Sequence, residues 1–107
     1  MAWVLLVAAG LFEIGFTTCL KLSEGFSKFW PSVGFAICAI LSFGLLTLAI
    51  KEIPLGTAYA IWTGIGAFGT ALVGIFFFGD AATTVRLLFL LLLIGSIIGL
   101  KIVSITS

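Results

Sequence analysis

The chain has 107 residues, of which 63% are hydrophobic and 8% are charged, and its formal net charge is +1. Soluble domains carry about 25% charged residues, so this composition excludes a water-soluble fold and predicts one domain inside a lipid bilayer. The sequence has no run of basic residues that would indicate nucleic-acid binding. It also has no GxxxxGK[ST] motif that would indicate ATP hydrolysis. The chain has no histidine, and Cys19 and Cys38 form no CxxC pair, so we predict no metal, no cofactor and no disulfide, and interpret both cysteines as small buried hydrophobic residues.

Long apolar segments follow one another with short polar links between them. Each segment has the length of about 20 residues that a helix needs to cross a bilayer. The alternation typical of a β-barrel strand is absent, so helices are expected. The sequence therefore predicts an all-α membrane protein with four transmembrane helices in a single domain, residues 1–107. The expected spans are 2–20, 31–50, 55–78 and 85–104.

Lysine and arginine are almost evenly divided between the two sides of the membrane. Lys51 and Lys101 fall on the side of the N-terminus, whereas Lys21, Lys28 and Arg86 fall on the other side. The positive-inside rule therefore gives almost no preferred orientation. Either the topology is poorly determined or both orientations are inserted, and the second option would allow an antiparallel dimer.

Two glycines one turn apart lie in the fourth span. Gly95 and Gly99 have the small-xxx-small spacing that lets two helix backbones approach closely. From this spacing alone, a dimer contact and packing within one subunit remain equally open.

A single carboxylate, Glu13, lies inside the first span. An ionised side chain at membrane depth is costly, so it usually faces an aqueous cavity, pairs with a cation or is protonated. Such a carboxylate can hold a proton or a cation, and the two compete, which is the minimal chemistry of a proton/cation exchanger. The structural alternative is a protonated glutamic acid that makes one hydrogen bond between helices.

Helical spacing predicts which side chains surround Glu13. Gly10, Phe16 and Thr17 lie on the same face of the first span and are expected to line a cavity. Ser42, in the second span, could reach the same cavity, although a lone serine in a membrane helix more often bonds to its own helix.

The third span contributes a second polar and aromatic face. Tyr59, Trp62 and Thr63 lie on one side of it, where the rings could face a cation or could serve packing at an interface. Gly64 and Gly66 weaken the same helix and predict a hinge, as alternating access would require.

Several segments of this chain resemble the small multidrug resistance family. They are the first span with Glu13, the link KLSEGFSKFWPS, the block PLGTAYAIWTGIGAFG and the ending GSIIGLK. The resemblance covers essentially the whole chain. It implies a multi-pass protein of the bacterial inner membrane that works as an antiparallel, dual-topology homodimer, or with a sister subunit, and exchanges protons for small cations.

The resemblance also implies roles for individual residues. Glu13 would be the shared proton and substrate site, and Tyr59 would couple its occupancy to gating. Trp62 would line the cavity and Ser42 would join the polar network around Glu13. Gly95 and Gly99 would match the dimer-forming fourth helix.

The family has one branch that exports guanidinium and another that exports bulky aromatic and quaternary ammonium compounds. The block GTAYAIWTGIGA resembles the guanidinium branch, but Phe16 stands where that branch typically has tryptophan. We therefore expect a proton-coupled antiporter for guanidinium and substituted guanidines such as amidinoureas, and the alternative is a broad-specificity quaternary ammonium antiporter. A structural subunit and a proton or cation channel are the rival classes, and an enzyme is not expected.

Overall fold

The computed structural model describes residues 1–106 and contains four helices in that range. They are α1 (Ala2–Leu22), α2 (Phe29–Ala49), α3 (Leu55–Phe77) and α4 (Thr84–Thr106). Each helix is long and apolar enough to cross a membrane. The predicted all-α architecture is thus confirmed, and every boundary lies within two residues of its expected position.

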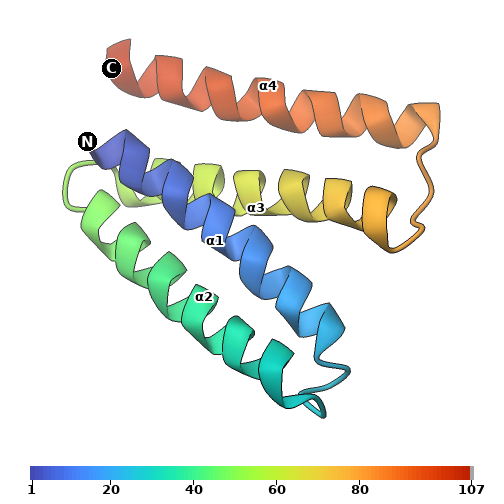
Figure 1. Cartoon of the computed structure of the whole chain (residues 1–107). Helices are drawn as coiled ribbons and strands as arrows, with labels where there is room; N and C mark the ends of the chain where they lie inside the picture. Colours follow the sequence, from blue (N-terminus) through green and yellow to red (C-terminus); the bar gives the residue numbers. More distant parts are fainter. Residues whose placement is uncertain (107) are drawn as a thin grey trace.

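The helices pack in an order that differs from their order along the chain. Helix α1 lies between α2 and α3, whose backbones approach each other at few positions, and α4 packs mainly on α3 (Figure 1). Both termini and the α2–α3 link lie at one end of the molecule, and the other two links lie at the opposite end (Figure 1). Lys51 and Lys101 therefore share an end, as the four-span topology predicts.

Two of the helix starts follow from proline. Pro54 is the N-cap of α3, and Pro31 lies in the first turn of α2, where a missing N–H leaves no hydrogen bond unmade. At the other end of the molecule, the link after α1 turns through Glu24, Gly25 and Phe26, which have φ angles of +48°, +74° and +66°.

Small residues bring the backbones of α1 and α3 close together. A Cβ on Gly10 would lie 2.7 Å from Cγ2 of Ile65, and a Cβ on Gly69 would overlap Ile14. Because van der Waals packing drives helix association in a bilayer, the close contacts at these two glycines fix the position of α3 on α1. Gly10 therefore serves the close packing of α1 on α3 in the single chain, and its predicted place in a cavity wall stays a prediction.

Helix α4 leaves most of its surface without a protein neighbour. None of its residues from Thr84 to Ser104 is buried within the chain. It touches α3 where Ile97 fits against Gly64, and a Cβ on Gly64 would lie 2.9 Å from Cδ1 of Ile97. A Cβ on Gly95 or Gly99 would meet no atom of the described chain within 4 Å. Packing within one subunit therefore does not account for this glycine pair.

Candidate functional site

The carboxylate of Glu13 lies where α1 crosses α3. Its Oε1 is buried and has no hydrogen-bond partner among the described residues. Gly66 of α3 faces it so closely that a Cβ at this position would overlap the carboxyl group. Buried polar atoms are normally hydrogen-bonded, so a buried carboxylate oxygen without a partner is suited to receive a proton or a cationic N–H donor.

A chain of two hydrogen bonds joins three helices beside Glu13. The Nε1–H of Trp62 donates to Oγ of Ser42 at 2.9 Å, and this hydroxyl donates to the backbone oxygen of Ala9 at 2.7 Å. Ser42 and Trp62 are both buried. The expectation that a lone membrane serine bonds to its own helix is wrong here. Because Ala9 lies one turn before Glu13, the two bonds hold α2 and α3 against the part of α1 that carries the carboxylate.

Four aromatic rings form a continuous row across the helices. Phe16 stacks on Phe43 with ring centroids 6.2 Å apart. Phe43 in turn lies 5.2 Å from Trp62, and Trp62 lies 5.7 Å from Tyr59. The sequence singled out three of these rings and missed Phe43. Aromatic ring faces of this kind are suited to contact an organic cation.

A second polar contact between α1 and α3 lies one turn beyond Glu13. The hydroxyl oxygens of Thr17 and Thr70 are 2.7 Å apart, and Thr17 also donates to the backbone oxygen of Ile14 at 3.0 Å. Sequence reasoning missed Thr70. This residue follows Gly66 by four positions, just as Thr17 follows Glu13 by four positions. Thr63, which was expected to line the cavity, donates to the oxygen of Tyr59 in its own helix at 2.8 Å.

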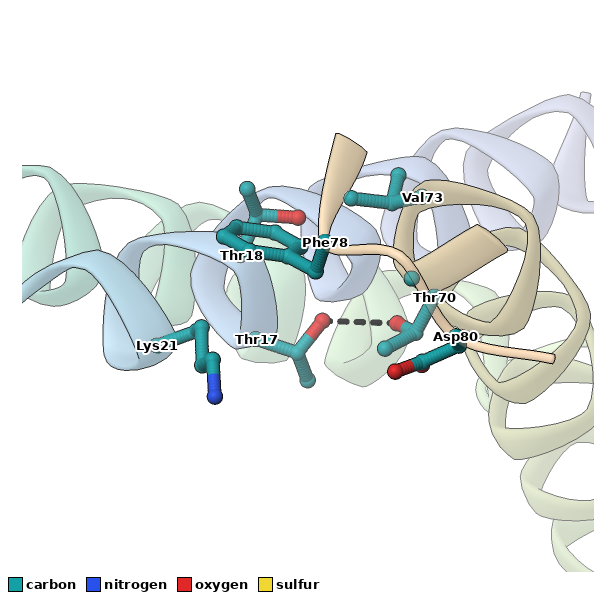
Figure 2. Close-up of a pocket in the computed structure, with 8 residues that line it drawn as sticks. Thr17, Thr18, Lys21, Thr70, Val73, Phe78 and Asp80 are labelled. Carbon is teal, nitrogen blue, oxygen red and sulfur yellow. Dashed lines mark hydrogen bonds between the residues drawn. The ribbon is translucent and has the colours of Figure 1, made fainter. Parts of the chain in front are cut away.

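A cavity of about 180 Å³ opens beyond this threonine pair, towards the end of the molecule that holds the α1–α2 and α3–α4 links (Figure 2). Lys21 and Asp80 flank the Thr17–Thr70 hydrogen bond on opposite sides in Figure 2. Asp80 forms no ion pair within the described chain, and the ammonium group of Lys21 lies 5.9 Å from the Phe78 ring centroid. The cavity is lined by Thr17, Thr18, Lys21, Thr70, Val73, Gly74, Phe78 and Asp80.

The described residues contain no group of three or more histidine, cysteine, aspartate or glutamate side chains that could hold a metal ion. Helix α3 is continuous from Leu55 to Phe77 through Gly64 and Gly66. The structure places both glycines at close helix contacts, so the hinge remains a prediction about movement.

Comparison with known proteins identifies the family to which this chain belongs. The family model of the small multidrug resistance protein matches residues 1–93. The chain therefore belongs to the small multidrug resistance family, and with its four membrane-spanning helices it is a multi-pass protein of the bacterial inner membrane.

Its relatives include several proteins named guanidinium exporter. The one from Proteus vulgaris is 49% identical over 104 residues, which cover 97% of this chain and all of the relative. The one from Yersinia pestis has the same identity and coverage. The one from Escherichia coli K12 is 48% identical over 102 residues, or 95% of this chain and 97% of the relative.

Proposed function

We propose that this protein exports guanidinyl cations, namely guanidinium and substituted guanidines such as amidinoureas, in exchange for protons. The relatives named guanidinium exporter support the substrate class. The observation that carries the mechanism is the buried Oε1 of Glu13, which lacks a hydrogen-bond partner among the described residues.

The chemistry of the site suits this class of cation. A guanidinium group is planar and presents N–H donors in a fork that matches the two oxygens of a carboxylate. The row of rings that contains Phe16, Phe43 and Trp62 supplies aromatic faces and begins three residues after Glu13, at Phe16. Phenylalanine at position 16 occupies less volume than tryptophan and has no N–H donor, so the site has room for a substituent on the guanidine.

Exchange follows from competition for one group. A proton and a guanidinyl cation both require the ionised carboxylate of Glu13, so they cannot occupy it together. Protonation on the outer side releases the cation, and loss of the proton on the cytoplasmic side allows the next cation to bind. Alternation between these states uses the proton gradient as the energy source.

Two subunits would complete the site. The unpartnered surface of α4 around Gly95 and Gly99 supports an antiparallel homodimer, or a dimer with a sister subunit. Two Glu13 carboxylates in one cavity would then titrate as a coupled pair, whose macroscopic pKa values belong to the dimer.

The second candidate is a broad-specificity exporter of quaternary ammonium ions. The observation in its favour is the exposed ring of Phe43 beside Phe16, because a quaternary ammonium ion has no N–H to donate and binds through ring faces.

Proton-coupled currents in liposomes test both candidates. The panel is guanidinium, an amidinourea and a bulky quaternary ammonium ion, applied to the native protein, to Glu13→Gln and to Glu52→Gln, which changes an exposed link carboxylate. Currents with guanidinyl cations that disappear only in Glu13→Gln support the proposal.

The other outcomes contradict it in distinct ways. Currents with quaternary ammonium ions alone favour the second candidate. Proton current without any counter-substrate indicates a channel. The absence of all currents in the native protein indicates a structural subunit, and currents that survive in Glu13→Gln exclude that carboxylate as the exchange site.

A further inference from the structure

Each of the two cysteines packs against a glycine of the neighbouring helix. A Cβ on Gly34 of α2 would lie 2.9 Å from Sγ of Cys19 in α1. In the same way, a Cβ on Gly15 of α1 would lie 3.0 Å from Sγ of Cys38 in α2. Each thiol therefore fills a notch in the opposite helix, and the two thiols lie one turn apart along the same helix contact.

The direction of the side chains brings the two sulfur atoms towards each other. Side chains in a helix lean towards its N-terminus, and α1 and α2 run in opposite directions (Figure 1). Cys19 therefore leans towards the level of Cys38, and Cys38 leans towards the level of Cys19. Both thiols are free and half-buried.

We propose that Cys19 and Cys38 form a two-coordinate site for a soft metal cation such as Hg(II), which would bridge α1 and α2. Thiolates are the ligands that soft cations prefer, and two sulfurs suffice for a linear S–metal–S arrangement. Binding breaks two S–H bonds and forms two metal–sulfur bonds, with two protons released to water and no change in oxidation state.

The same geometry disfavours a direct disulfide. Each cysteine stands opposite a glycine rather than opposite the other cysteine, which offsets the two positions by roughly 6 Å along the helix axes in addition to the separation of the helices. A disulfide requires Cα atoms within about 7 Å. A metal ion between the sulfurs lengthens the link by two metal–sulfur bonds and tolerates the offset.

The test is a titration of the purified full-length protein with Hg(II) in the presence of a monothiol competitor, followed by metal–thiolate absorbance and by mass. We expect one Hg(II) per chain, held on the order of a hundredfold more tightly than in Cys19→Ser or in Cys38→Ser, because the second thiol binds within the same molecule. Equal affinity in the native protein and either variant, or two Hg(II) ions per native chain, would overturn the proposal. The readout is metal binding, so it does not depend on transport.

Two glycine variants test the geometry. Gly34→Ala places a methyl group against Sγ of Cys19 and should weaken Hg(II) binding about fivefold or more. Gly44→Ala, also in α2, adds a methyl group that meets no described atom within 4 Å and should leave binding unchanged. A metal that links two chains, seen as a dimer mass under denaturing conditions, would show that the thiols do not chelate within one subunit.

Discussion

The carboxylate of Glu13 lies directly against the backbone of Gly66, so that no side chain fits between α1 and α3 at this level. The sequence suggested Gly66 as a hinge. In the folded chain its missing side chain makes room for the carboxyl group, and this room sets the place at which the proposed exchange would occur.

Gly66→Ala should displace the Glu13 side chain and lower guanidinyl-dependent proton currents about tenfold or more, since small errors in the position of a reacting group are costly. The measurement is the current in liposomes with matched amounts of inserted protein. The control is Gly56→Ala in the same helix, where a Cβ meets no described atom within 4 Å. Equal currents in the two variants would show that the contact with Gly66 does not position the carboxylate.

Ser42→Ala should leave the indole N–H of Trp62 without its acceptor and destabilise the protein by about 1–2 kcal/mol. The measurement is unfolding of the purified protein in detergent. Ser96→Ala is the matched control, because this exposed hydroxyl donates to Leu92 in its own helix. If the losses of unfolding free energy in Ser42→Ala and Trp62→Phe simply add in the double variant, the two side chains do not stabilise the protein as a pair.

Hydrophobicity and length were sufficient to predict the four helices, because a span of about 20 apolar residues has few alternatives in a bilayer. The lone charge of Glu13 was equally visible, since nothing else in its span is ionised. These features depend on the local chain alone.

The partners of the site could not be predicted in the same way, because they depend on how the helices pack. Helical periodicity gives the face of each residue but not the residue across from it. Thr70 and Phe43 were therefore missed, and the close approach of Ile65 to Gly10 was not foreseen. The placement of each cysteine opposite a glycine of the other helix likewise depends on the α1–α2 register.

Phe16→Trp should shift preference towards unsubstituted guanidinium by about tenfold relative to an amidinourea. The larger ring would occupy the space beside Phe43 and would add an N–H donor near Glu13. The measurement is the ratio of kcat/KM values for the two substrates in liposomes. Phe29→Trp, at an exposed position where α2 begins, is the control and should leave the ratio unchanged. An unchanged ratio in Phe16→Trp would remove position 16 from the determinants of specificity.

Charges at the mouth of the cavity in Figure 2 should act on cations in opposite directions. Asp80 attracts a cation and Lys21 repels it, so Asp80→Asn should raise KM for guanidinium about threefold and Lys21→Gln should lower it by a similar factor. Both effects should shrink as salt rises from low to physiological concentration, because screening acts over about 8–10 Å there. The measurement is KM at the membrane face that this cavity meets, with kcat as the check on folding and coupling. Changes of the same sign in the two variants, or changes in kcat alone, would mean that Asp80 and Lys21 support the structure of the link and do not guide the cation.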